Sequence, residues 1–281
     1  MAKRRWKSAK PKKSPLPATN QCGFSPAGHR GRGITMLTER TWRLETVPYL
    51  LVGLFISVCL GSAVMSLMGV SSMEEAAEKR FLVLLANALF VHGVILGMIA
   101  YFLRANQTGW AAAFGFGRGP VLRQAAWAAG ALLIILPAAW ALSKWSMDLI
   151  HLIGGKPEAQ MPVVFLQSRP PWQETAFVGF STILLAPVVE EMLFRGLLYP
   201  SVKRAGFPKT ALLAIAFLFA AFHSNLMTFV PLFMLGLVLA MVYEATDNLL
   251  APILLHSFFN AANFLVLIFD LHPEQLLNRL W

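Results

Sequence analysis

Residues 175–200 of the chain read TAFVGFSTILLAPVVEEMLFRGLLYP, an apolar run interrupted by three charged side chains. A helix needs about 20 apolar residues to cross about 30 Å of hydrocarbon, so this run is long enough for a transmembrane helix. An ionisable side chain inside such a helix costs about 2.5 to 3.5 kcal/mol on insertion scales and marks a functional site by default. Glu190, Glu191 and Arg195 are therefore the first candidate site residues.

The rest of the chain has the same apolar character. Of its 281 residues, 57% are hydrophobic and only 14% are charged, which is far from the composition of a soluble domain. We therefore predict an all-α fold, a polytopic transmembrane helix bundle of about seven membrane helices, or eight if one escapes detection. Two of the seven runs, 209–224 and 228–244, which are the fifth and sixth in chain order, are short for a full crossing. The six further runs are 48–70, 81–103, 124–143, 209–224, 228–244 and 249–269.

The polar segments between the runs suggest how the chain is divided. Eleven of the 24 Lys and Arg residues lie between Lys3 and Arg43, so residues 1–40 are predicted to form a basic, disordered tail before a bundle in 41–281. Residues 144–173, rich in Gly and Pro, predict an extracytoplasmic loop with one interfacial helix. Two cysteines exclude a disulfide framework and a Cys-based zinc motif.

Orientation is predicted from the basic residues, because short cytoplasmic loops collect Lys and Arg. With a cytoplasmic N-terminus, seventeen Lys and Arg fall inside and six outside, although without the tail the loops divide six to six. We predict a multi-pass protein of the plasma membrane with its N-terminus in the cytoplasm.

The spacing of the charged residues separates the two glutamates. Glu191 and Arg195 are four residues apart on one helix face and can form an ion pair, whereas Glu190 lies about 140° round from Arg195. Glu190 is thus the freer base. The alternative is that both glutamates only neutralise Arg195 in a buried cluster.

Two other runs carry their strongly polar groups at a similar depth. His223 ends the fifth run, and His256, Asn260 and Asn263 form one stripe of the seventh. Counted from the turn at 201–208, Glu190 and His223 lie about 17 to 21 Å deep and Asn260 about 17 Å, with His256 one turn lower. A histidine taken singly is more often a packing residue, but three helices at one level predict a shared site.

The chemistry of this set suits hydrolysis. A glutamate with an imidazole beside it can deprotonate a water that attacks a peptide carbonyl. His256 and the Asn260 amide are donors suited to an oxyanion. Serine with a partner base, a pair of membrane aspartates and a His-Glu-x-x-His motif are all absent from the sequence, which disfavours those protease classes.

These residues resemble the CAAX-protease and bacteriocin-processing family of intramembrane endopeptidases, which includes the type II CAAX prenyl endopeptidases. The resemblance implies a protease core at residues 174–270, with Glu190 and His223 activating water and Glu191 with Arg195 holding the site together. It also implies that His256 and Asn260 stabilise the oxyanion. The matching motifs are Glu190-Glu191-x-x-x-Arg195, Phe219-x-x-x-His223 and His256-x-x-x-Asn260.

The family has been described both as metalloproteases and as metal-independent glutamic proteases. We expect no obligate cofactor, and zinc held by Glu190, His223 and His256 is the open alternative, since nitrogen and carboxylate ligands suit a catalytic zinc. The expected partners are a membrane-associated peptide or protein substrate and the lipid bilayer, with no nucleic acid.

Two other functions share these residues. One is a catalytically silent bacteriocin-immunity or scaffold protein of the same fold. The other is an ion or proton transporter, which the absence of internal repeats disfavours.

Overall fold

A computed structural model describes residues 37, 42, 46–69 and 79–271 of the chain. These residues form helices and no strand. The predicted all-α transmembrane bundle is confirmed, because six helices are long and apolar enough to cross a membrane. The tail predicted for residues 1–40 lies outside the described residues, except for Leu37. The six spans are Pro48–Leu67, Phe81–Ala105, Val121–Leu152, Trp172–Arg204, Leu226–Thr246 and Leu250–Ile268.

Several spans are assembled from shorter pieces, in which η denotes a π-helical segment. The second span consists of α3 (Arg80–Asn87), η2 (Ala88–His92) and α4 (Gly93–Ala105). The fourth consists of α8 (Trp172–Phe180), η3 (Ser181–Leu185), α9 (Ala186–Glu191), η4 (Met192–Leu198) and α10 (Tyr199–Arg204). The remaining helices are α1 (Thr46–Leu67), α5 (Trp110–Phe114), α6 (Val121–Leu152), α7 (Met161–Gln167), α11 (Pro208–Phe222), α12 (Leu226–Thr246) and α13 (Leu250–Ile268).

One predicted boundary was wrong, the end of the third run. The third run was expected to end near residue 143, but α6 continues to Leu152, where Gly154 at φ 79° follows the helix end. Residues 144–152 are therefore helical and not part of a loop. The sixth run, expected at 228–244, is found as α12, which is two residues longer at each end and has 21 residues. The Asn225 side chain caps its start by accepting the Thr228 N–H. The expected short fifth run is confirmed in α11, which has 15 residues.

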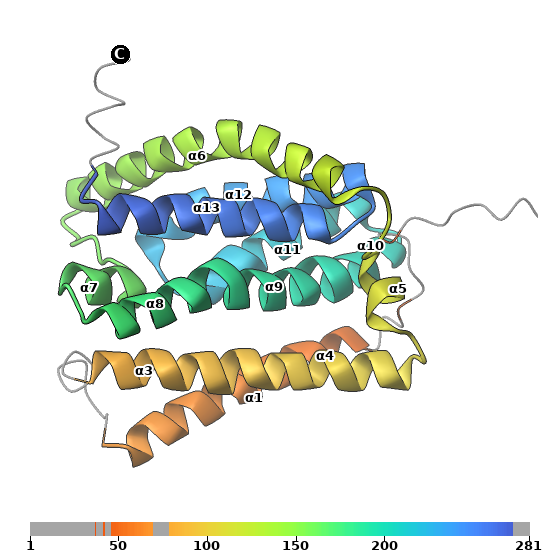
Figure 1. Cartoon of the computed structure of the whole chain (residues 1–281), viewed down its shortest axis with the longest axis horizontal. Coiled ribbons are helices and arrows are strands. Elements are labelled where there is room, and N and C mark those ends of the chain that lie inside the picture. The colour runs from red at the N-terminus through yellow and green to blue at the C-terminus, as the bar shows by residue number, and fades with distance from the viewer. Residues whose placement is uncertain (1–36, 38–41, 43–45, 70–78, 272–281) are drawn as a thin grey trace, which may run out of the picture. The chain divides into compact units, whose positions relative to one another are not determined.

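The helices pack in layers around the fourth span. α6 lies along α12 and α13 and bows over them, with Pro137 inside the helix as the cause of bending (Figure 1). α11 packs closely on α12 because Gly236 lacks a side chain: a Cβ there would lie 3.1 Å from both Cα and Cβ of Ala216. Val189, Leu193 and Phe194 of the fourth span are completely or almost completely buried in the core.

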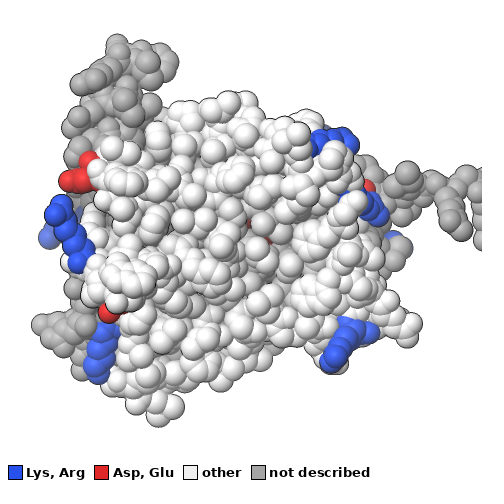
Figure 2. Space-filling view, viewed as in Figure 1, with Lys and Arg blue, Asp and Glu red and all other residues white. Residues whose placement is uncertain are grey.

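Charged side chains gather at the two ends of the face shown in Figure 2, and the band between them is almost free of them. Such a band is expected of a protein that crosses a membrane, since a charge in hydrocarbon is costly. Within one end, Arg118 pairs with Asp247 and Lys203 pairs with Glu244. The chain is therefore an integral, multi-pass membrane protein.

Candidate active site

The fourth span presents both candidate glutamates on a short α-helical stretch between two π-helical segments. α9 has six residues, with η3 before it and η4 after it. A proline is the second residue after each of these two segments: Pro187 follows η3 and Pro200 follows η4. Proline lacks an N–H and its ring clashes with the preceding turn, so these prolines explain why the helix widens there.

The carbonyl groups near these prolines are used by other elements. Pro187 offers no N–H to the preceding turn, and the Thr182 carbonyl in η3 accepts a hydrogen bond from Asn260 Nδ2 at 2.7 Å. In the turn before Pro200, Trp42 Nε1 donates to the Gly196 carbonyl at 3.1 Å. The prolines thus connect the fourth span to α13 and to the segment before α1.

The predicted ion pair between Glu191 and Arg195 is confirmed. Arg195 Nη1 donates to Glu191 Oε1 at 2.8 Å, and both side chains are almost completely inaccessible. Arg195 Nη2 donates to the Gly236 carbonyl at 3.1 Å, which the close approach of α12 makes possible. The guanidinium also lies 4.5 Å from the ring centre of Phe219, a cation–π contact. Arg195 is thereby fixed by α9, α11 and α12.

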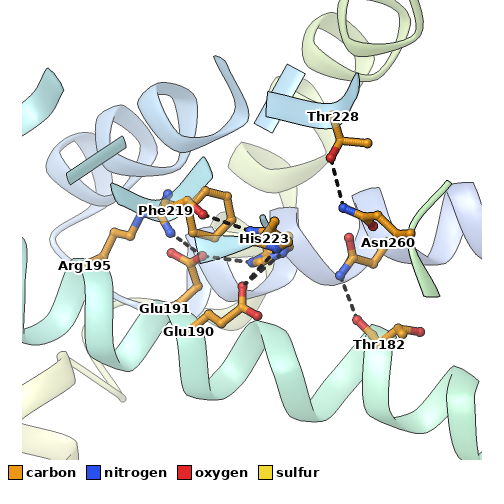
Figure 3. A network of polar contacts seen from close by, with 10 residues as sticks. Thr182, Glu190, Glu191, Arg195, Phe219, His223, Thr228 and Asn260 are labelled. Carbon is orange, nitrogen blue, oxygen red and sulfur yellow. Dashed lines mark hydrogen bonds and ion pairs between the residues drawn. The ribbon is translucent and has the colours of Figure 1, made fainter. Parts of the chain in front are cut away.

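The two imidazoles converge on Glu190 from different helices, as Figure 3 shows for His223. His223 follows the end of α11, and His256 lies within α13. The Nε2 atoms of His223 and His256 each lie 4.0 Å from Glu190 Oε2. A single water molecule can bridge groups at this separation. The expected convergence of these three side chains is therefore observed, whereas their catalytic roles stay predictions.

The second nitrogen of each imidazole faces an acceptor. His223 Nδ1 lies 2.9 Å from the Phe219 carbonyl, and His256 Nδ1 lies 2.9 Å from Glu191 Oε1. A carbonyl and a carboxylate only accept hydrogen bonds, so these contacts assign the proton to Nδ1 in both rings. In the neutral form, each Nε2 then presents a lone pair towards Glu190.

The electrostatics of the cluster follow from this assignment. Two carboxylates and one guanidinium leave one negative charge in excess when both imidazoles are neutral and both carboxylates ionised. A buried negative charge needs hydrogen-bond donors around it. Glu190 Oε2 has no hydrogen-bond partner among the described residues, although it is buried. A water molecule that donates one hydrogen to Glu190 Oε2 and the other to an imidazole Nε2 would satisfy two of these three acceptors.

His223 is the most accessible of the three side chains around Glu190. Its side chain is 21% exposed, against 10% for Glu190 and 3% for His256. The turn after it is fastened to the segment before α7: Asn225 Nδ2 donates to the Glu158 carbonyl at 2.8 Å. Gln160 Nε2 donates to Thr228 Oγ1 at 3.0 Å. The accessible side of the cluster is therefore the one at His223.

Asn260 lies beside this cluster rather than in it. It is one helical turn from His256 on α13, and Figure 3 shows it next to Thr182, away from the Glu190 carboxylate. One amide hydrogen is used on the Thr182 carbonyl, which leaves a second for another acceptor. Asn263 has a different position, because its Oδ1 accepts from Trp140 Nε1 at 3.0 Å and joins α13 to α6.

The sequence interpretation missed Thr182 and Gly236, which act through their backbone carbonyls. Side-chain chemistry gives no signal for such groups. Pro187, five residues after Thr182, was the available clue to a carbonyl without its helical donor.

The candidate zinc ligands were tested against the same geometry. Within the part of the chain that the structure describes, no group of three or more His, Cys, Asp and Glu side chains meets the geometry of a metal site. The donor types of Glu190, His223 and His256 nevertheless suit zinc. The Nδ1 contacts of His223 and His256 resemble the outer hydrogen bonds that orient histidine ligands.

Residues 172–262 match the family model of type II CAAX prenyl endopeptidase Rce1-like proteins. This part of the chain is an Rce1-like domain. The match includes the glutamates, both histidines and Asn260, and it confirms the resemblance to the CAAX-protease family that the motifs predicted. No curated protein and no solved structure shows a significant match to the chain. The Rce1-like domain identifies a family of membrane proteases, and the match carries no metal assignment.

Proposed function

We propose that this protein is an intramembrane endopeptidase in which Glu190 activates the water that hydrolyses a peptide bond. One observation carries the proposal: within an Rce1-like domain, a buried carboxylate oxygen of Glu190 lies 4.0 Å from two imidazole Nε2 atoms. The substrate is a membrane-associated peptide or protein. The family match does not favour a silent immunity protein or a transporter.

The reaction begins with a water bound between Glu190 and His223. Glu190 takes one proton while the water oxygen attacks the carbonyl carbon, which forms the new C–O bond and places a negative charge on the carbonyl oxygen. Asn260 can donate its second amide hydrogen to this oxyanion, and His256 can donate from Nε2 only when it is protonated. The proton on Glu190 then passes to the leaving nitrogen as the C–N bond breaks.

Glu191 and Arg195 act on this step through His256. The carboxylate of Glu191 fixes the ring with its Nε2 towards Glu190, and Arg195 fixes the carboxylate. They are therefore positioning residues, held in place by the Gly236 carbonyl and the Phe219 ring.

The proposal is tested by peptide cleavage in proteoliposomes. Glu190→Gln keeps the size of the side chain but removes the base, and we expect the rate to fall about 10² to 10⁴-fold. His223→Ala should fall comparably, whereas Glu174→Gln, at the start of α8, should keep the wild-type rate. Cleavage by Glu190→Gln at the wild-type rate would refute the role of Glu190. Failure of the folded wild-type protein to cleave any member of a prenylated and unprenylated peptide library would refute the enzyme itself.

Metal dependence is tested separately. We propose a metal-independent reaction; in the alternative, Glu190, His223 and His256 would hold a zinc ion that supplies a Lewis acid and an activated water. We expect cleavage to survive dialysis against a chelator, with no stoichiometric metal in the active protein. Loss of activity on dialysis and its recovery with zinc, but not with magnesium, would establish the zinc alternative.

A further inference from the structure

A groove runs along the outside of the bundle between α6 and α12. Its volume is about 680 Å³, within the range of about 300 to 1,000 Å³ that is usual for small-molecule sites. None of the candidate active-site residues lines it. Its walls include Trp127, Gly130 and Ile134 of α6 and Val238 and Met241 of α12, and Arg123 is its one charged lining residue.

The groove exists because small residues replace bulky ones on the membrane-crossing part of α6. A Cβ added at Gly130 would meet no atom within 4 Å, so this helix face is open rather than packed. Since α6 is one of the six spans, the groove faces hydrocarbon for most of its length. Its apolar walls suit a hydrocarbon chain.

The mouth of the groove has a different chemistry. Arg123 lies in the first turn of α6, at the helix end that also holds Arg118. Arg118 is paired with Asp247, whereas no described residue forms an ion pair or side-chain hydrogen bond with Arg123. Trp127 follows one turn further in, in the order of cation and aromatic ring that is common at membrane interfaces.

Arg123, Trp127, Gly130 and Ile134 form one stripe, because they are spaced at i, i+4, i+7 and i+11. Eleven residues of helix extend about 16 Å. One leaflet of a bilayer is about 15 Å deep, half of a hydrocarbon core of about 30 Å. The stripe therefore has the length of one acyl chain below one head group.

We propose that this groove binds an anionic phospholipid, with its phosphate at Arg123 and one acyl chain along Gly130 and Ile134. Arg123, a cation without an ion-pair partner among the described residues, lies at the mouth of an apolar channel of leaflet depth, which favours a lipid over another occupant. A free phosphate would leave the apolar walls uncovered, and an apolar helix would leave the Arg123 charge unmatched.

The experiment is native mass spectrometry of the full chain in detergent, titrated with phosphatidylglycerol or phosphatidylcholine of the same acyl chains. We expect the wild type to bind phosphatidylglycerol more tightly. Arg123→Gln should weaken phosphatidylglycerol binding about five-fold, as expected for the loss of one basic residue at a lipid head group. Phosphatidylcholine binding should weaken less, because the choline cation already offsets the charge of its phosphate. Gly130→Leu should fill the groove and weaken the binding of both lipids.

The matched control is Gly97→Leu in α4, where an added Cβ also meets no atom within 4 Å. This variant should bind both lipids like the wild type, and all three variants should keep the wild-type unfolding temperature. Equal binding of the two lipids by the wild type would overturn the proposal. So would equal lipid binding by Gly130→Leu and Gly97→Leu, which would include the case in which the groove binds a second copy of the chain instead of a lipid.

Discussion

Glu191 is the side chain on which the most polar contacts of the candidate site depend. Its Oε1 atom accepts from Arg195 Nη1 at 2.8 Å and lies 2.9 Å from His256 Nδ1. Removing one member of a buried pair leaves an uncompensated charge, which costs far more than the pair contributes. If Glu191 lost its charge, the Arg195 guanidinium would stay buried and could not be hydrated, because its side chain is only 1% exposed.

We predict that Glu191→Gln destabilises the protein by about 3 to 5 kcal/mol, because it leaves the Arg195 charge buried without a carboxylate. Thermal unfolding in detergent measures this. Asp148→Asn, which removes an exposed ion pair with Lys144, should change stability by less than about 1 kcal/mol. A double variant with Glu191→Gln and Arg195→Met should recover part of the lost stability. If Glu191→Gln were as stable as Asp148→Asn, the charge cluster would not hold the fold together.

At the residue scale, the sequence predicted this pair correctly and Asn260 incompletely. Glu191 and Arg195 are four apart, so helical spacing alone is enough to place them together. Asn260 was expected at the level of Glu190, but His256 faces Glu190 and Asn260 contacts the Thr182 carbonyl, eight residues earlier in the fourth span. A helical wheel of one sequence segment contains no such information.

At the scale of elements, two π-helical segments set the direction of the glutamates. A wheel of 100° per residue assumes a uniform α-helix, and η3 and η4 break that assumption on either side of α9. The signal that was available is Pro187 and Pro200, each the second residue after a π-helical segment. The close approach of α12 to α11 at Gly236 could not be predicted either, because it depends on which helices are neighbours.

Gly236 provides a test at this scale. We predict that Gly236→Ala lowers stability by about 1 to 3 kcal/mol, since the new Cβ would press on Ala216 at 3.1 Å and separate the helices. The shift would also move the Gly236 carbonyl away from Arg195, so peptide cleavage should fall as well. Gly97→Ala is the control, because its Cβ meets no atom within 4 Å and alanine favours a helix. Equal unfolding temperatures for the two variants would contradict this packing argument.

At the scale of the whole molecule, length and hydropathy predicted the bundle well, because a membrane span must be a long apolar helix. They failed where helices pass beyond the apolar run: α6 includes Lys144 and Asp148, which lie exposed four residues apart on its surface. A charged helix end and a polar loop have similar composition, so the boundary at Leu152 could not be predicted from polarity. The Gly154-Gly155 pair was the better marker of the helix end.

The orientation of the bundle is the last prediction and follows from the positive-inside rule. Arg204 is the last residue of the fourth span and lies next to Lys203. Lys156 lies in the segment between α6 and α7, which should face the opposite side. In a chain without Cys22 and Cys59, we predict that a membrane-impermeant maleimide labels Lys156→Cys in intact cells. Arg204→Cys should react only after the membrane is opened. The reverse pattern would place the N-terminus outside, and with it the end of the bundle at which Arg123 would meet a lipid phosphate.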